Sequence, residues 1–319
     1  MNIAILGYGT VGRGVFEIAH KHTDINVIKI FDKEEKFDKQ YIELFTNDLK
    51  KIVENDEIDL VVETLGGFDF AYNCIKESLN HQKHVVTANK EIVALKIDEL
   101  LNLAKNNGVN FMFEASVGGG IPIIKNLFAI KRANQILAIK GILNGTTNYI
   151  LTSVENGISF DEALKNAQKL GFAEADPTAD LEGFDMMRKI AILSDIAWNT
   201  KISLDDIIQK GVTKISNEDY LEAKKNNKVI KFIACATREN DKVIIKVEPT
   251  ILDKTDILAN IKYETNAVVL TTYPNDELVF IGKGAGSLPT ASAIISDICD
   301  IIEHKVHVNY NNENVLKIN

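Results

Sequence analysis

The stretch Ile3-Ala4-Ile5-Leu6-Gly7-Tyr8-Gly9-Thr10-Val11-Gly12 decides the fold of this 319-residue chain. Its apolar first part predicts a strand, and the G-x-G-x-x-G pattern that follows opens a segment with helical spacing, Val11–Lys21. Closely spaced glycines let the backbone turn tightly and approach a pyrophosphate, whose charge then faces the helix N-terminus. The residues predicted to bind a dinucleotide here are Gly7, Gly9, Thr10, Val11 and Gly12.

An acid stands where such a site binds the adenosine ribose. Asp32 follows the strand-like run Asn26–Phe31 and lies 20 residues (32 − 12) after Gly12. A carboxylate accepts hydrogen bonds from the ribose hydroxyls and repels a 2′-phosphate, which favours NAD. The adjacent Lys33 could pair with that phosphate, so NADP stays open. The competing interpretation is a glycine turn with a structural role only.

Apolar and amphipathic segments alternate through the first third of the chain. Short β-rich runs at Asp59–Glu63, His84–Thr87 and Asn110–Phe113 are separated by amphipathic stretches at Ala71–Asn80 and Ile97–Asn106. Strands that alternate with helices predict βαβ units and an α/β fold with a Rossmann-type, doubly wound parallel sheet.

The pattern changes after the glycines at 118–120. Further helices are predicted at Ile121–Ala133 (with Pro122 in its first turn), Thr146–Glu155, Asp161–Leu170, Asp185–Trp198 and Thr290–His304, which begins after Pro289. Strands are predicted at Gln135–Leu143, Lys228–Thr237, Lys242–Leu252, Thr265–Tyr273 and Glu277–Lys283. This pattern indicates a second, α+β domain with a mixed or antiparallel sheet and helices on one face. We place the dinucleotide-binding domain at residues 1–125 plus 287–319, and a substrate and dimerisation domain at 126–286.

Composition excludes several classes of partner. The net charge is −9 and there is no basic patch with interleaved aromatics, so nucleic acid is not an expected partner. No apolar run reaches the roughly 18 residues of a membrane helix. The N-terminus has no signal-peptide pattern, and we expect a cytoplasmic protein without membrane contact. Lys-rich stretches such as 33–39 and 224–231 are interpreted as solvated surface.

The cysteine and histidine residues do not form the patterns that predict a metal site or a disulfide. Cys74, Cys235 and Cys299 are scattered and form no CxxC pair, so we interpret them as core residues. His81 and His84 lack the carboxylate or thiolate company that a metal site needs.

Three further segments leave predicted strands at the edge where ligands gather in open α/β sheets: Thr64–Gly67, Thr87–Lys90 and Glu114–Gly120. Thr64, Thr87 and Lys90 are predicted to contact the cofactor, and the alternative for each segment is a surface connection. The consecutive glycines of the third segment suggest close approach to a ligand or a hinge, and its exposed carbonyls could bind a monovalent cation.

Two segments of the second domain carry polar chemistry. Asn144–Tyr149 starts a predicted helix, where amide and hydroxyl groups suit capture of a carboxylate or form an ordinary capping turn. Five acids lie between Glu174 and Asp185, and Asp185 shares a helix face with Lys189 at spacing i, i+4. Carboxylates would bind a substrate ammonium, and the lysine would exchange a proton with a reacting hydroxyl. The simpler alternative is an acidic loop followed by a surface ion pair.

Together these segments resemble homoserine dehydrogenase. The blocks that carry the resemblance are Gly7–Gly12, Ala88–Lys90 with Glu114–Pro122, Gly141–Ile150, Leu170–Lys189, and Gly282–Gly286 with Pro289–Ala293, and they span nearly the whole chain. The resemblance implies an NAD(P)-dependent oxidoreductase that interconverts L-homoserine and L-aspartate 4-semialdehyde in the biosynthesis of threonine, methionine and isoleucine. It also implies a homodimer.

The resemblance assigns catalytic roles to three residues. Lys189 corresponds to the proton donor to the carbonyl in aldehyde reduction and to the base in the reverse direction. Lys90 corresponds to a second lysine near the nicotinamide with a share in the proton transfer, and Asp185 to a contact of the catalytic lysine.

The resemblance also assigns binding roles. The residues that correspond to substrate contacts are Glu174, which holds the amino group, and Asp180, Gly145 and Thr146. The residues whose backbone oxygens bind a structural sodium ion in some members are Glu114, Val117, Gly119 and Ile121.

The chain departs from the family in two ways. Many members carry a C-terminal regulatory domain or an N-terminal kinase, whereas this chain ends soon after its last predicted helix, so we expect the short, stand-alone form. Some members have Tyr where Phe172 stands, and a hydroxyl contact there is missing. Two other functions are compatible with the residues: a dehydrogenase of another amino-acid-derived alcohol or aldehyde, and an NAD-binding redox sensor without turnover.

Overall fold

The computed structural model describes residues 1–239 and 242–304. The chain divides into two compact units: the first holds Met1–Lys125 and the described residues from Ala285 onward, and the second holds Asn126–Gly284. The chain therefore leaves the first unit once and returns to it near its end. The dinucleotide-binding domain at 1–125 plus 287–319 and the substrate and dimerisation domain at 126–286 stay predictions, and residues 305–319 of the first lie outside the described residues.

A six-stranded parallel sheet forms the centre of the first unit. Its strands are β1 (Asn2–Leu6), β2 (Asn26–Phe31), β3 (Phe45–Thr46), β4 (Leu60–Glu63), β5 (His84–Thr87) and β6 (Phe111–Met112). Their order is β3-β2-β1-β4-β5-β6, so the winding reverses between β1 and β4. This is the Rossmann order, and dinucleotides bind at the carboxyl ends of the strands at that switch point. The predicted fold class is confirmed.

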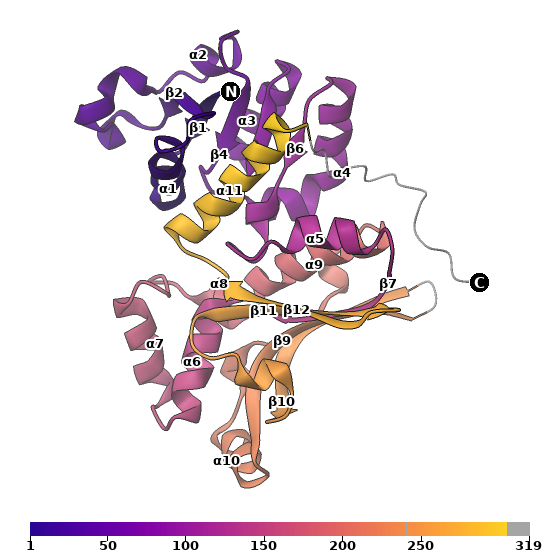
Figure 1. Cartoon of the computed structure of the whole chain (residues 1–319). Coiled ribbons are helices and arrows are strands. Elements are labelled where there is room, and N and C mark those ends of the chain that lie inside the picture. The colour runs from indigo at the N-terminus through magenta and orange to yellow at the C-terminus, as the bar shows by residue number, and fades with distance from the viewer. Residues whose placement is uncertain (240–241, 305–319) are drawn as a thin grey trace. The chain divides into compact units, whose positions relative to one another are not determined.

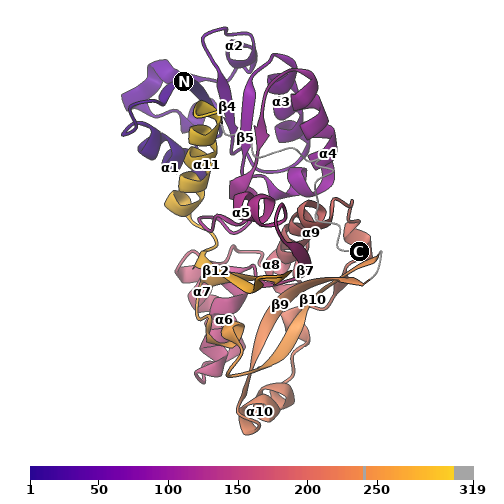
Figure 2. The same cartoon turned by 45° about the vertical axis from the view of Figure 1, so that its right-hand side comes forward.

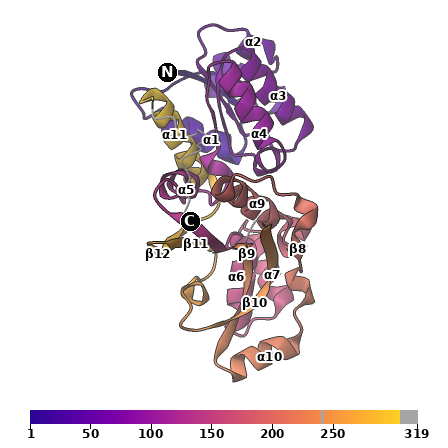
Figure 3. The same ribbon diagram turned by 90° about the vertical axis from the view of Figure 1, so that its right-hand side faces the viewer.

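Helices cover both faces of this sheet. On one face α1 (Thr10–Ala19) lies beside α11 (Ser287–Ile302), so that the yellow end of the described chain returns to the indigo start (Figure 1). On the other face α3 (Asp69–Asn80) lies beside α4 (Lys90–Asn106), and Figure 3 shows the sheet between the two pairs. A short helix, α2 (Lys50–Val53), precedes β4.

The core of the first unit depends on the α1–α11 contact. Ile3 and Ile5 of β1 pack with Val15 of α1 and Ile294 of α11, and all four are fully buried. Gly14 permits the close approach, because a Cβ there would lie 2.7 Å from the Ser287 hydroxyl oxygen. The residues that end the described chain therefore complete the core that the first residues begin.

A six-stranded mixed sheet, in the order β12-β11-β7-β9-β10-β8, forms the second unit. Its strands are β7 (Gln135–Ile142), β8 (Ile208–Gln209), β9 (Lys228–Glu239), β10 (Lys242–Asp253), β11 (Thr265–Tyr273) and β12 (Asp276–Lys283). β8 runs parallel to β10, and the other pairs are antiparallel. β9 and β10 form a long hairpin, seen in Figure 2, with α10 beside the end where β9 begins.

Six α-helices follow β6 before the chain reaches β9. They are α5 (Ile123–Ile130), α6 (Gly145–Glu155), α7 (Phe160–Lys169), α8 (Thr178–Leu181), α9 (Phe184–Trp198) and α10 (Asn217–Lys225). Both α6 and α9 pack against β9, and α9 also packs against β7 and β10. The strand β7 and the helices α6 and α9 thus carry the predicted substrate segments on one scaffold.

Several expectations about single segments were wrong. Pro122 lies before α5 rather than in its first turn, and α11 begins at Ser287, which places Pro289 inside its first turn, where a missing N–H costs little. The polar helix α10 was not predicted. Lys231 was assigned to solvated surface, yet it is fully buried, because its ammonium donates to the carbonyl oxygen of Ile261 at 2.6 Å and to Asn148 Oδ1 at 3.0 Å.

Residues 1–239 and 242–304 contain no helix that is both long and apolar enough to span a membrane. Cys74, Cys235 and Cys299 are free thiols, and only Cys74 is fully buried.

Candidate active site

The loop Gly7–Gly12 joins β1 to α1 at the carboxyl edge of the parallel sheet. Gly7 has a φ of +96°, and a Cβ there would lie 2.7 Å from the carbonyl oxygen of Thr64. A Cβ at Gly12 would lie 1.9 Å from the carbonyl oxygen of Gly7. The turn itself therefore requires these two glycines.

Gly9 faces open space instead. A Cβ there would meet no described atom within 4 Å, although Gly9 is the N-cap of α1 and no side chain caps the helix that begins with Thr10 and Val11. Free N–H groups and the helix dipole favour an anion at such an end, and an unfilled cradle in front of it admits a pyrophosphate. The residues present fit a dinucleotide.

Asp32 lies directly after β2 and is 5% exposed. Its Oδ2 accepts a hydrogen bond of 2.7 Å from the Tyr8 N–H, and its Oδ1 accepts one of 2.8 Å from the Lys33 N–H. The Lys36 ammonium lies 3.5 Å from Oδ1. Because each carboxylate oxygen can accept a second hydrogen bond, ribose hydroxyls remain compatible with this arrangement.

The loop after β4 is tied to the glycine loop by Thr64. Its hydroxyl is 3.0 Å from the carbonyl oxygen of Leu6 and 2.9 Å from that of Gly7, and it serves as donor to them. The structure thus brings the predicted cofactor residue Thr64 to the glycine loop.

The loop after β5 leads into α4. Thr87 ends β5, and Lys90 is the first residue of α4, whose N-cap Asn89 accepts a hydrogen bond from the Ile92 N–H. Thr87 and Lys90 therefore lie at the same carboxyl edge as the glycine loop.

The segment Glu114–Ile121 forms a buried turn after β6. The Glu114 carboxylate caps the start of α5 by accepting from the N–H groups of Ile124 at 2.9 Å and Lys125 at 2.7 Å. Burial, and then the neighbouring Asp297, raise the pKa of Glu114 to about 8. A positive φ at Gly118 and Gly119 turns the backbone here, so part of the glycine run has a local structural reason.

In the second unit, Asn144 connects the two predicted substrate segments. As the N-cap of α6, its Oδ1 accepts a hydrogen bond of 2.9 Å from the Thr147 N–H. Its Nδ2 is 2.7 Å from Asp180 Oδ1 and 2.9 Å from Asp185 Oδ2 and donates to both. The capping turn was one of the two readings of this segment, and the same residue also gathers the carboxylates.

Lys189 lies one turn after Asp185 on α9, as the i, i+4 spacing predicts. Its ammonium donates to Asp185 Oδ2 at 2.8 Å and to the carbonyl oxygen of Leu143 at 2.7 Å, and both charged side chains are about nine-tenths buried. The surface ion pair offered as the simpler alternative is therefore wrong. An ammonium has three N–H donors, and among the described residues two are used.

Asp180 and the start of α6 meet around Thr146. The Thr146 hydroxyl donates to the carbonyl oxygen of Phe172 at 2.6 Å and also hydrogen-bonds Asp180. Burial, followed by the charge of Asp185, raises the pKa of Asp180. Gly145 is the first residue of α6, and a Cβ there would lie 2.8 Å from the carbonyl oxygen of Glu264.

Glu174 is not drawn into this cluster by a described contact of its side chain. It lies exposed between α7 and α8, and its carbonyl oxygen accepts from the Gln168 amide at 3.1 Å. The structure therefore brings together Asp180, Asp185, Lys189 and Thr146, and leaves Glu174 at the margin.

Sequence reasoning gave no single role to Asn144, Asn266 or Glu63. The buried Asn266 Oδ1 has no hydrogen-bond partner in the described part of the chain and would lie 3.5 Å from a Cβ at Gly145. Glu63 is fully buried at the end of β4. Two signals in the sequence were available: Glu63 is an acid at the end of an apolar strand, and Asn144 is an amide just before a helix.

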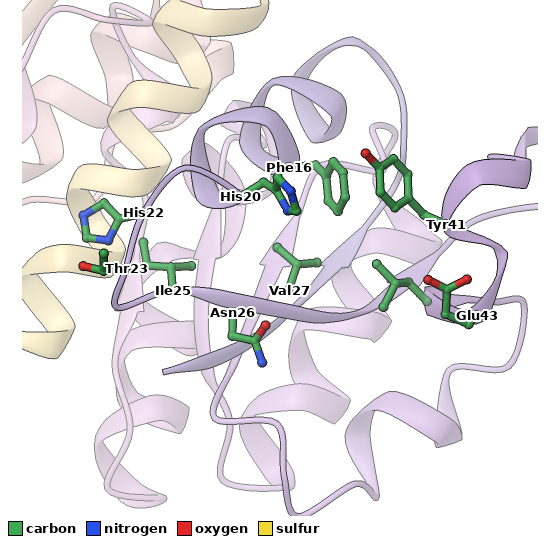
Figure 4. Close-up of a pocket in the computed structure, with 10 residues that line it drawn as sticks. Phe16, His20, His22, Thr23, Ile25, Asn26, Val27, Tyr41 and Glu43 are labelled. Carbon is green, nitrogen blue, oxygen red and sulfur yellow. The ribbon is translucent and has the colours of Figure 1, made fainter.

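A separate cavity of about 600 Å³ opens at the amino end of β2, where the rings of Phe16, His20 and Tyr41 line one wall (Figure 4). The rings of Phe16 and Tyr41 lie 4.8 Å apart. Asp32 and the glycine loop lie at the carboxyl edge of the sheet, so this cavity is separate from the predicted cofactor residues. No cluster of three or more His, Cys, Asp or Glu side chains able to hold a metal was found in the described parts of the chain.

Models of known protein families match both units of the chain. A family model described as homoserine dehydrogenase matches residues 122–299, and one described as homoserine dehydrogenase, NAD binding domain, matches residues 7–114. The chain belongs to the homoserine dehydrogenase family. It therefore has NAD(P)-dependent oxidoreductase chemistry, the interconversion of L-homoserine and L-aspartate 4-semialdehyde in amino-acid biosynthesis.

Individual members of the homoserine dehydrogenase family resemble the chain over almost its whole length. The homoserine dehydrogenase of Bacillus subtilis is 37% identical over 317 residues, which are 95% of this chain and 73% of that relative. The crystal structure of a homoserine dehydrogenase from Thiobacillus denitrificans gives a TM-score of 0.90 at 34% identity and covers 98% of this chain and 75% of that one. A hyperthermophilic archaeal homoserine dehydrogenase in complex with NADPH gives a TM-score of 0.82 at 28% identity, covering 95% and 98%.

Proposed function

We propose that Lys189 exchanges the proton with the substrate oxygen. The observation that carries the proposal is the buried cluster in which Asp185 and the Leu143 carbonyl fix two directions of the Lys189 ammonium. The remaining N–H can donate to a carbonyl oxygen during aldehyde reduction, and in the reverse direction the amine takes up the hydroxyl proton. The bound nicotinamide would supply the hydride chemistry.

The neighbouring carboxylates are proposed to bind and orient the substrate. Asp180 and Glu174 are suited to the substrate ammonium, and Gly145 with Thr146 to its carboxylate end. Asp180 is held in place by Asn144 and Thr146, whereas Glu174 is exposed and free to turn toward a ligand. Fixed polar groups of this kind contribute to catalysis through positioning and electrostatics.

The cofactor is proposed to lie along the carboxyl edge, from Gly7–Gly12 and Asp32 to Thr64, Thr87 and Lys90. Lys90 is assigned a secondary share in the proton transfer. Asp32 favours NAD, but Lys36 beside it offsets part of its charge, and NADPH binds the archaeal relative. We therefore propose use of both cofactors, with NAD preferred.

The proposed reaction has a direct test. Purified protein is mixed with L-homoserine and either NAD or NADP at alkaline pH, and nicotinamide absorbance is followed. Reduction is expected with both and faster with NAD. Cofactor binding without reduction would overturn the assignment of the Lys189 cluster.

A structural sodium ion is proposed at the carbonyl oxygens of Glu114, Val117, Gly119 and Ile121. The positive φ values of Gly118 and Gly119 curve this backbone, although the Ile121 oxygen already accepts from the Ile123 N–H at 2.8 Å and would use its second lone pair. Thermal unfolding in sodium and in choline chloride tests the site. A melting temperature that is equal in both would exclude it.

We also propose a cytoplasmic homodimer built on the second unit. One face of its sheet carries Ile281, which is 52% exposed, and Ile244, which is 36% exposed. Apolar side chains on an open sheet face favour pairing with a second copy. Light scattering should give twice the chain mass, and an Ile281→Glu variant should lower it.

A further inference from the structure

Glu63 ends β4 at the carboxyl edge of the sheet and is fully buried. It stands between the loops that carry Thr64 and Thr87, and the proposed mechanism gives it no task. A carboxylate removed from water is costly unless it is hydrogen-bonded, so its contacts require an explanation.

Both carboxylate oxygens of Glu63 accept hydrogen bonds from these loops. The Leu65 N–H donates to Oε1 at 2.8 Å, and the Thr87 hydroxyl donates to Oε2 at 2.5 Å. The Gly66 N–H and the Asn89 side-chain amide also hydrogen-bond this carboxylate. All four groups are donors, which is the environment that an ionised carboxylate satisfies and a protonated one does not.

The same network reaches the helix that begins with Lys90. The Thr87 hydroxyl oxygen accepts from the Asn89 N–H at 2.9 Å, and the Asn89 amide donates to the carbonyl oxygen of Gly67 at 2.7 Å. Glu63 thus links the loop after β4 to the start of α4. Both loops flank the place proposed for the nicotinamide.

The charge of this carboxylate distinguishes the two forms of the cofactor. The oxidised nicotinamide ring carries a positive charge, and the reduced ring is neutral. Inside a protein an electrostatic interaction acts more strongly and over longer distances than in water. We propose that Glu63 is a positioning residue whose buried negative charge strengthens the binding of the oxidised cofactor relative to the reduced one. The inference rests on the proposed cofactor site.

Its test compares the dissociation constants of the two cofactor forms on the full chain without substrate. Fluorescence titration gives the dissociation constant of the reduced form. Displacement of the bound reduced form by the oxidised form gives the dissociation constant of the oxidised form. In Glu63→Gln the dissociation constant of the oxidised form should rise on the order of tenfold, as loss of one interacting charge requires, while that of the reduced form changes much less. Equal changes in both constants, or no change, would overturn the proposal.

Asn89→Ala is the matched control. It removes the Asn89–Gly67 hydrogen bond, the cap of α4 and one donor to the carboxylate, but it keeps the carboxylate itself, so the selective loss of the oxidised form should be much smaller than in Glu63→Gln. An equally selective loss in Asn89→Ala would contradict the charge argument.

Thr87→Val keeps the proposal testable if Glu63→Gln does not fold. Burial raises the pKa of Glu63, and the Thr87 hydroxyl is the main group that opposes this rise. Without that donor the carboxyl holds its proton to higher pH, and the preference for the oxidised form should shrink near neutrality. An undiminished preference would count against the proposal. If the wild-type chain binds neither form, the cofactor site itself is wrong, whereas binding of both with an unchanged ratio in Glu63→Gln removes this inference alone.

Discussion

The ammonium of Lys189 lies 2.8 Å from Asp185 Oδ2, one helical turn away, and both side chains are buried. A buried ion pair contributes little stability once its desolvation is counted, and breaking it by removing one partner is costly. Its retention beside Asn144 and Asp180 therefore points to a chemical use. The pair also fixes the position of the Lys189 ammonium.

Replacing Lys189 by Ala should abolish most turnover and leave the affinity for the cofactor unchanged. We expect kcat to fall roughly 100- to 10,000-fold, the usual contribution of a positioned acid or base. Initial rates measure the loss of turnover, and fluorescence titration with the reduced cofactor measures its affinity. Lys169→Ala, at an exposed lysine of α7, is the control and should leave both unchanged. Parallel loss of cofactor affinity would refute the role assigned to Lys189.

Asn144→Ala should damage both stability and substrate binding. It removes the cap of α6 and the amide shared by Asp180 and Asp185, so the free energy of unfolding should fall by about 2 kcal/mol and KM for homoserine should rise. Urea denaturation and steady-state kinetics measure the two effects. Ser159→Ala removes only the cap of α7 and should cost about 1 kcal/mol with KM unaltered. An unchanged KM in Asn144→Ala would leave that residue a purely structural cap.

Two glycine variants should separate folding from cofactor binding. Gly9→Ala places a methyl group in open space, so the melting temperature should stay constant while cofactor affinity drops roughly tenfold or more, because the backbone there must approach the pyrophosphate. Gly12→Ala meets the Gly7 carbonyl and should cost about 1–3 kcal/mol of stability. Differential scanning fluorimetry without NADH measures the stability of each variant, and the shift in melting temperature on adding NADH measures cofactor binding. An unchanged cofactor affinity in Gly9→Ala would contradict the pyrophosphate position proposed beside Gly9.

The buried Lys231 should make stability depend on alkaline pH. Burial lowers its pKa to about 8, so between about pH 8 and 10.5 the unfolded chain binds more protons than the folded one. The free energy of unfolding should therefore rise with pH across this window by up to about 1.4 kcal/mol per pH unit. Denaturation of the wild type and of Lys231→Met at several pH values isolates the contribution. Parallel curves for the two proteins would show that Lys231 does not titrate there.

The sequence predicted those parts of the fold that local patterns encode. β1, β4 and β5 were found because strands buried on both faces form short apolar runs, and the glycine spacing then set their topology. α10 was missed because it is polar, although Ser216 and Asp219 form a capping box that the sequence displays.

The rest of the site depends on long-range contacts that no local pattern encodes. Asn144 meets Asp180 across 36 residues, and Thr87 meets Glu63 across 24. The burial of Lys231 likewise follows from its contact with Ile261, thirty residues away. The i, i+4 pair of Asp185 and Lys189 was predictable because both residues lie on one helix.

The return of α11 to α1 sets the order in which the molecule can be completed during synthesis. The second unit is continuous from Asn126 to Gly284, so its sheet can close as soon as that stretch leaves the ribosome. The parallel sheet, although made first, lacks a core helix until Ser287–Ile302 emerges. A nascent chain stalled before that point would hold the later-made unit folded and the earlier-made one open, with the apolar side of α1 available to chaperones.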